Sequence, residues 1–164
     1  MEGNLYEERI YSRWNIVVMS VVVLALLAAL IRQLVSGPLG TNPAPNSLLI
    51  AMILLFLIIG VNFATVTIRV TIRGISVGYG IIRRHIPWGR VVGCRLDEAS
   101  ALRYGGWGVR VARAGGKRRL VYNIIGAPRV VVEDRLGRYQ EFVFSTRKPE
   151  AVMKAINEGL GKRS

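Results

Sequence analysis

The chain has 164 residues, 51% of them hydrophobic, and a mean hydropathy of +0.35, so it is more apolar than an ordinary soluble domain. Its net charge is +13, and all of this excess lies after residue 65, because three arginines balance three glutamates before that point. Cys94 is the only cysteine, which excludes an intrachain disulfide and a cluster of thiolate metal ligands.

Residues 1–14 precede the first apolar stretch and carry three glutamates and two arginines interleaved with aromatic side chains. Tyr6, Ile10 and Trp14 recur at helical spacing, which predicts a short cytoplasmic lead-in helix. Aromatic residues just ahead of a span are typical of the membrane–water interface. A segment that binds a partner is the open alternative.

Two long apolar stretches are predicted to cross a membrane as helices, residues 15–35 and residues 48–66. The second begins with LLIAMILLFLIIGV, fourteen residues without a charge. Extended to residue 68, this helix would be roughly 30 Å long, the thickness of the hydrocarbon core of a bilayer. A cleaved signal peptide is disfavoured for the first stretch, because acidic residues precede it and its apolar core is too long.

Residues 36–47, SGPLGTNPAPNS, are predicted to be an external loop between the two spans, since they carry no charge and three prolines. Arginines mark the opposite side of the membrane, with Arg9 and Arg13 before the first span and Arg69 and Arg73 after the second. We therefore expect a multi-pass protein of the plasma membrane with both termini in the cytoplasm.

Residues 67–164 are predicted to form one cytoplasmic domain of short strands. Val66, Ile68 and Val70 alternate with polar residues, which is the period of a strand rather than a helix. Further strands are expected at residues 75–77, 81–86, 91–96, 104–112, 117–122, 130–133 and 138–144. A helix at about 149–160, with Pro149 in its first turn, ends the series.

The predicted fold class is therefore an α+β membrane protein: a two-helix transmembrane hairpin followed by a small antiparallel β-sandwich or barrel that is capped by a C-terminal helix. Strands first and one amphipathic helix last is the element order of a pleckstrin-homology-like (PH-like) domain.

Three short segments resemble the PH-like membrane proteins of bacteria and archaea. Ile86-Pro87-Trp88 before Val91-Val92 resembles their IPW step, and residues 104–110, YGGWGVR, resemble a glycine–tryptophan segment found in some of them. Residues 137–150 resemble their last strand and helix entry, although Lys148 stands where the family more comfortably carries aspartate or another capping residue.

The resemblance covers residues 66–160 and implies a bent sheet with one open end plugged by a helix, often preceded by one or two spans. It implies no catalytic residues. Phosphoinositide specificity is not implied either, because the first turn, Arg73-Gly74, is too short for the basic loop of eukaryotic PH domains.

Several motifs that suggest enzymes fail on inspection of their context. Gly78-Tyr79-Gly80 begins like a dinucleotide fingerprint, but Arg83 occupies the third glycine position and a strand follows where a helix is needed. His85 is the only histidine, so no second imidazole can complete a metal pair. The adjacent acids Asp97-Glu98 and Glu133-Asp134 point to opposite faces of a strand, and we interpret them as turn and edge charges. We expect no cofactor, no metal and no enzymatic activity.

Basic clusters after the second span are the strongest candidates for a functional surface. They comprise Arg83, Arg84, Arg110, Arg113, Lys117, Arg118 and Arg119. A solvated face is the commoner explanation of a charge run, but each cation near an anionic leaflet gains up to about 1 kcal/mol. We expect this surface to contact anionic lipid headgroups, or an unidentified membrane or cytoplasmic protein.

The sequence thus predicts a non-enzymatic, membrane-anchored interaction module. The alternative is a membrane-tethered nucleic-acid-binding protein, because a charge of +13 also suits a phosphate backbone. That alternative is disfavoured, since the chain has no aromatic-and-basic motif of a known nucleic-acid module.

Overall fold

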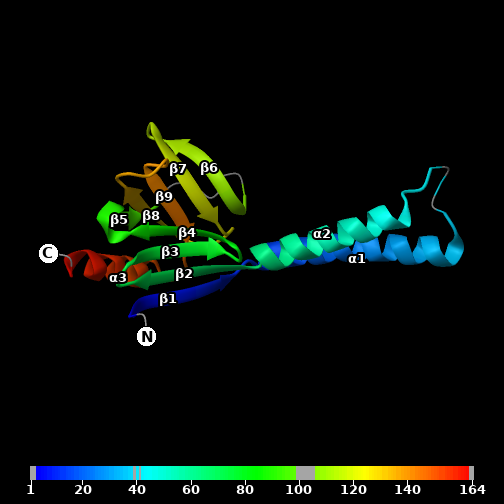
Figure 1. Cartoon of the computed structure of the whole chain (residues 1–164), viewed down its shortest axis with the longest axis horizontal. Coiled ribbons are helices and arrows are strands. Elements are labelled where there is room, and N and C mark those ends of the chain that lie inside the picture. Colours follow the sequence, from blue (N-terminus) through cyan, green and yellow to red (C-terminus); the bar gives the residue numbers. More distant parts are fainter. Residues whose placement is uncertain (1–2, 39, 41, 99–105, 163–164) are drawn as a thin grey trace. The chain divides into compact units, whose positions relative to one another are not determined.

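The computed structural model describes residues 3–38, 40, 42–98 and 106–162, and it is an α+β structure with two apolar helices, two β-sheets and a C-terminal helix (Figure 1). The chain divides into two compact units. One unit is the helical hairpin Ser12–Ala64, and the other, called the domain below, combines Met1–Tyr11 with Thr65–Ser164. The hairpin is therefore an insertion within the sequence of the domain.

Helices α1 (Arg13–Ser36) and α2 (Asn46–Phe63) form the hairpin unit. Both are long and apolar enough to cross a membrane. Few side chains are buried between them, and most of their leucines, isoleucines and valines are exposed, as expected of helices whose apolar surface is not covered by protein. The second predicted span, 48–66, ends too late, because α2 stops at Phe63 and Thr65 already belongs to a strand.

Polar contacts close both ends of the hairpin. At the end where the chain enters and leaves, the backbone N–H of Ser12 donates to the Ala64 carbonyl at 2.8 Å, and Asn15 Nδ2 donates to the Gly60 carbonyl at 3.3 Å. At the other end, Gln33 Nε2 donates to Asn46 Oδ1 at 2.6 Å. These contacts link α1 and α2 at both ends of the pair.

The first sheet of the domain contains β1 (Asn4–Tyr11), β2 (Thr65–Thr71), β3 (Gly74–Tyr79) and β4 (Ile82–Pro87), antiparallel and in that order. The expected lead-in helix at residues 1–14 is wrong, because residues 4–11 form a strand. Tyr6 and Ile10 are four residues apart, so they share one face in a strand as they would in a helix. Pairing with β2 decides between the two, with Ile10 opposite Val66 and Tyr6 opposite Val70.

The second sheet has the order β5 (Val91–Leu96), β8 (Arg129–Asp134), β9 (Glu141–Ser145), β7 (Lys117–Asn123), β6 (Gly108–Ala114). The β6–β7 hairpin lies between β5 and β8 in sequence but joins the sheet beside β9, through a parallel β7–β9 pair. The predicted all-antiparallel arrangement is wrong for this pair, and the two sheets do not close into a barrel. Residues 104–105 of the predicted strand 104–112 lie outside the described residues.

Aromatic and branched side chains fill the core between the sheets. The Tyr79 ring on β3 lies 5.9 Å from the Tyr122 ring on β7, which packs edge-on against Phe142 of β9. Helix α3 (Pro149–Gly161) contacts β1 and β2 of the first sheet and β5 and β8 of the second. Its buried face, Val152, Ala155 and Ile156, therefore covers one end of the core.

Candidate functional site

The seven basic residues singled out in the sequence lie on three strands of the domain. Arg83 and Arg84 are on β4, and the others are on the β6–β7 hairpin. They do not form one surface, because some are buried in ion pairs while others face solvent. Their partners decide what each can do.

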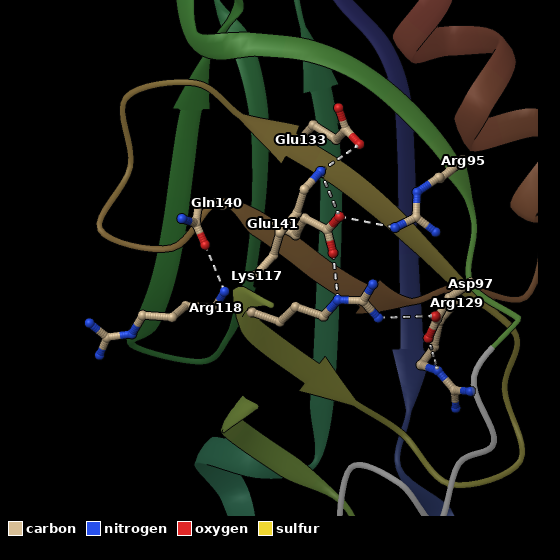
Figure 2. A network of polar contacts seen from close by, with 9 residues as sticks. Arg95, Asp97, Lys117, Arg118, Arg129, Glu133, Gln140 and Glu141 are labelled. Carbon is tan, nitrogen blue, oxygen red and sulfur yellow. Dashed lines mark hydrogen bonds and ion pairs between the residues drawn. The ribbon is translucent and has the colours of Figure 1, made fainter. Parts of the chain in front are cut away.

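Figure 2 shows a polar network around Glu141 and Asp97, and the ion pairs of the buried Arg119 make it a member of this network. Its guanidinium pairs with Glu141 and lies 3.7 Å from Asp97 Oδ1, and only 8% of the residue is exposed. Arg95 binds Glu141 at 3.0 Å, and Arg129 binds Asp97 at 2.9 Å. Arg119 is thus part of the internal structure of the domain rather than of a solvent-facing surface.

Lys117 joins the same network from the start of β7. Its Nζ lies 3.5 Å from Glu141 Oε1 and 3.6 Å from Glu133 Oε1. Burial alone would raise the pKa of the Glu141 carboxyl, but the hydrogen bond from Arg95 and the charge of Arg119 outweigh it, so its pKa lies below the ordinary value. Glu141 therefore stays ionised and holds its three cations at neutral pH.

Arg84 lies in a second buried group, at the corner between the two sheets. The Asp134 carboxylate on β8 accepts hydrogen bonds from Arg84 at 3.3 Å and from Arg90 at 2.9 and 2.6 Å. The side chains of Asp134 and Asp97 are 1% and 2% exposed. Their interpretation as turn and edge charges is therefore wrong, since both are centres of buried ion pairs.

Arg110, Arg113 and Arg118 remain at the surface of the β6–β7 hairpin. Arg113 and Arg118 are directly opposite each other in the antiparallel register, and like charges in that position destabilise a sheet. The Arg118 guanidinium lies 5.8 Å from the centre of the Tyr139 ring. This pair of exposed arginines, which we call the hairpin-tip pair, presents two cations from neighbouring strands, as suits an anionic group.

Arg83 lies at a different end of the domain. Tyr11 and Thr65 are opposite each other where β1 and β2 join the helical hairpin, and Tyr79 is opposite the next residue, Val66. The β3–β4 turn thus lies at the same end of the first sheet as the two connections to the helical hairpin. We call this end of the sheet the hairpin-connected edge. Arg83 is exposed there and donates from Nε to the Gly80 carbonyl at 3.0 Å.

The hairpin-tip pair lies away from the hairpin-connected edge. The Tyr79 hydroxyl donates to the carbonyl of Asn123, the last residue of β7, at 2.6 Å. Lys117, at the other end of β7, is six residues away, or about 20 Å along an extended strand. In Figure 1 the β6–β7 tip accordingly lies at the top of the domain, apart from the β3–β4 turn. The basic residues therefore form two separate surfaces.

Sequence reasoning missed two features of the hairpin-connected edge. Arg9 on β1 is exposed, and it lies on the same face of the first sheet as Arg83. The two residues are joined by one row of cross-strand partners, which runs from Arg9 through Thr67 and Gly78 to Arg83. Ile81, in the β3–β4 turn, is 89% exposed. The sequence contains a sign of the exposed isoleucine, because Ile81 directly follows the turn residue Gly80, and turns usually carry polar residues.

His85 and Cys94, the single histidine and the single cysteine of the chain, lie on β4 and β5. His85 is an exposed residue of β4, and the half-buried Cys94 thiol lies 3.7 Å from Asn157 Oδ1. Burial raises the pKa of Cys94, which disfavours the reactive thiolate. Among the residues that the structure describes, no group of three histidine, cysteine, aspartate or glutamate side chains could hold a metal ion.

No protein-family model, no curated protein and no solved structure matches this chain.

Proposed function

We propose that this protein is a non-enzymatic, membrane-anchored interaction module, in which a helical hairpin fixes a basic PH-like domain on the cytoplasmic face of the plasma membrane. The observation that carries the proposal is the position of the hairpin. It is inserted between two neighbouring strands, β1 and β2. Only Ser12 lies between β1 and α1, and only Ala64 lies between α2 and β2.

This insertion constrains the membrane topology. Since β1 and β2 pair along their length, from Tyr11 opposite Thr65 to Asn4 opposite Thr71, both must lie on the same side of the membrane. Either both helices cross the bilayer or neither does. Their length and apolar exposed surface favour crossing, and the arginines that flank the spans favour a cytoplasmic domain.

Three observations support the PH-like part of the proposal. Within the domain, the element order is strands followed by one C-terminal helix, as the resemblance implies. Helix α3 packs against strands of both sheets, which is the position expected of a helix that plugs an open end. Trp88, from the IPW segment, is buried against Gly159 of this helix.

The two basic surfaces suggest two kinds of contact. Arg9 and Arg83 lie on the hairpin-connected edge and suit anionic lipid headgroups, which the anchor brings within reach. The hairpin-tip pair, Arg113 and Arg118, suits a carboxylate- or phosphate-bearing group of a protein partner. Five carboxylates of the domain pair with its own arginines or with Lys117, and these are Glu7, Asp97, Glu133, Asp134 and Glu141.

A thermal-shift experiment on the full-length protein in neutral detergent tests the lipid contact. Phosphatidylglycerol added to the micelles should raise the melting temperature more than phosphatidylcholine does, because a ligand of the folded state stabilises it by mass action. Arg9→Gln/Arg83→Gln should lose most of this difference, whereas the matched pair Arg113→Gln/Arg118→Gln should keep it. Each shift is measured against the melting temperature of the same variant without lipid.

Duplex DNA at the same phosphate concentration and salt separates the proposal from the nucleic-acid alternative. We expect a smaller shift with DNA than with phosphatidylglycerol. A larger shift with DNA would instead favour the membrane-tethered nucleic-acid-binding protein. No preference for phosphatidylglycerol over phosphatidylcholine would contradict the lipid contact.

A further inference from the structure

We infer that the β3–β4 turn is a lipid-inserting loop, in which Ile81 enters the interfacial layer of the bilayer and Arg83 contacts an anionic headgroup beside it. The inference rests on the proposed function and specifies which part of the domain contacts lipid. It is carried by the position of the turn, the exposure of its side chains and the conformation of Arg83.

The turn is on the edge of the sheet from which the chain enters the helical hairpin. Tyr79, the last residue of β3, is opposite Val66, the second residue of β2. Ala64, which belongs to the hairpin unit, is only two residues before Val66. Neighbouring strands are about 4.8 Å apart, so the turn lies within about 10 Å of the point where the chain leaves the domain.

The side chains at this edge are unusually apolar for an exposed turn. Gly80 has φ +44°, as suits the first central position of a tight hairpin turn, and Ile81 follows in the second. Ile81 is 89% exposed, and Ile82 and Tyr11 on the same edge are 40% and 59% exposed. Exposed aliphatic residues with an exposed tyrosine on the same edge of a domain are typical of surfaces that enter the membrane interface.

Arg83 is positioned to complement the insertion. Gly78, opposite Arg83, has no room for a Cβ, because one there would meet both the backbone and the side chain of Arg83. The stem of Arg83 therefore lies over Gly78, and its Nε donates to the Gly80 carbonyl at the turn. An arginine can keep its stem in apolar surroundings while its guanidinium reaches a phosphate at the interface.

A lipid surface explains this edge better than a protein partner does. The apolar turn and the two points where the chain continues into apolar helices lie on one edge, so the covalent connection keeps the turn within short reach of a bilayer that holds the helices. Leu136 provides a comparison, since it is also in a turn and 75% exposed, but it lies in the β8–β9 connection and not on the hairpin-connected edge.

Depth-dependent fluorescence quenching of the full-length protein tests the inference. In a Cys94→Ser background, an environment-sensitive dye is attached at I81C, at L136C or at L55C in the middle of α2. The proteins are reconstituted in phosphatidylcholine vesicles with or without phosphatidylglycerol. Doxyl-labelled lipids quench dyes within the bilayer, and aqueous iodide quenches dyes in water.

We expect the dye at residue 81 to shift its emission to the blue and to lose intensity with doxyl lipids, as the dye at residue 55 does, while the dye at residue 136 responds to iodide alone. Arg83→Gln should weaken the quenching at residue 81 only when phosphatidylglycerol is present, and the control Arg118→Gln should not. Loss of the effect in the first variant alone would assign the headgroup contact to Arg83.

Two outcomes would overturn the inference and can be told apart. If the dye at residue 55 is quenched by doxyl lipids but the dye at residue 81 responds only to iodide, the hairpin is inserted and the turn is not. If the dye at residue 55 is also in water, the proposed membrane anchor itself fails, and the lipid-inserting turn fails with it.

Discussion

Glu141 shows most clearly how single residues decide the stability of this domain. Its carboxylate is 1% exposed and lies within ion-pair distance of Arg95, Lys117 and Arg119. A buried carboxylate with this many charge-assisted contacts is expensive to remove, because the cations around it would be left without a counter-charge. Removal of the Glu141 carboxylate should therefore destabilise the second sheet, because the buried cations stay behind.

Glu141→Gln should lower the free energy of unfolding by about 3 kcal/mol, the range found when one partner of a buried ion pair is removed. Glu133→Gln is the matched control. Glu133 is partly exposed and lies 3.6 Å from the half-exposed Lys117, so its loss should be below about 1 kcal/mol. Chemical denaturation in detergent, followed by tryptophan fluorescence, measures both; equal losses in the two variants would argue against a dominant role for the buried carboxylate.

The lowered pKa of Glu141 predicts how the free energy of unfolding depends on pH. The pKa of Glu141 is lower in the folded protein than its ordinary value of 4.5, so the folded state favours the ionised form. Its contribution is fully present above pH 4.5 and is lost as the pH falls through the lowered pKa. The difference in unfolding free energy between the wild type and Glu141→Gln should therefore shrink below pH 4.5. A difference that stays constant down to pH 3 would contradict this.

The sequence could not reveal these pairs. Charge runs such as Lys117-Arg118-Arg119 look alike in sequence, yet alternation along β7 sends Arg118 and Arg119 to opposite faces of the sheet. The parallel pairing of β7 with β9 then places Arg119 opposite Glu141. Such long-range register is not encoded in local composition, so the candidate surface was predicted only as a set of cations and not as two surfaces and a buried network.

At the scale of elements, β1 is the strand that the sequence pattern assigned to a helix, and it joins the N-terminal residues to the domain. It pairs with β2 along its whole length, and Glu8 accepts hydrogen bonds from the Thr146 hydroxyl at 2.6 Å and from the Arg147 backbone at 2.9 Å. These contacts connect β1 to the segment that leads into α3. The compact unit that contains β1 is therefore discontinuous in sequence.

A chain of residues 65–164 alone should fold poorly, whereas residues 1–11 joined to residues 65–164 by an Asn-Gly turn should fold as a soluble domain. The turn replaces the hairpin between the paired residues Tyr11 and Thr65, and Asn-Gly suits a two-residue connection of antiparallel strands. Dispersed amide NMR shifts and cooperative melting are expected only for the joined chain. Equally good spectra from both chains would show that β1 is dispensable.

Helix α3 gives a second prediction at this scale. A Cβ at Gly159 would meet the Trp88 ring, whereas a Cβ at Gly161 would meet nothing within 4 Å. Gly159→Ala should therefore destabilise the domain by about 1–2 kcal/mol, because overpacking outweighs the gain in helix propensity. Gly161→Ala should be neutral or slightly stabilising. Thermal melts of the two variants in parallel decide this, and a stabilised Gly159→Ala would mean that the helix does not pack closely on Trp88.

At the scale of the whole molecule, hydropathy and period predicted most of the architecture. Two apolar helices, short strands and the closing helix all appear, and β5 has the predicted bounds. Hydropathy could not show that the hairpin interrupts a domain, because the first strand is only eight residues long and fits two periodicities. Nor could it show that β7 pairs in parallel with β9, since this pairing joins segments that are distant in sequence.

The central claim is that the hairpin spans the membrane while both flanking strands stay on the cytoplasmic side. Single cysteines at Asn4, Asn42 and Gly161, in a Cys94→Ser background, test it with a membrane-impermeant maleimide on intact cells. We predict that the cysteine at position 42 is labelled from outside, and that those at positions 4 and 161 are labelled only after the cells are permeabilised. Protection of position 42 together with the other two, or labelling of positions 4 and 161 from different sides, would contradict the account.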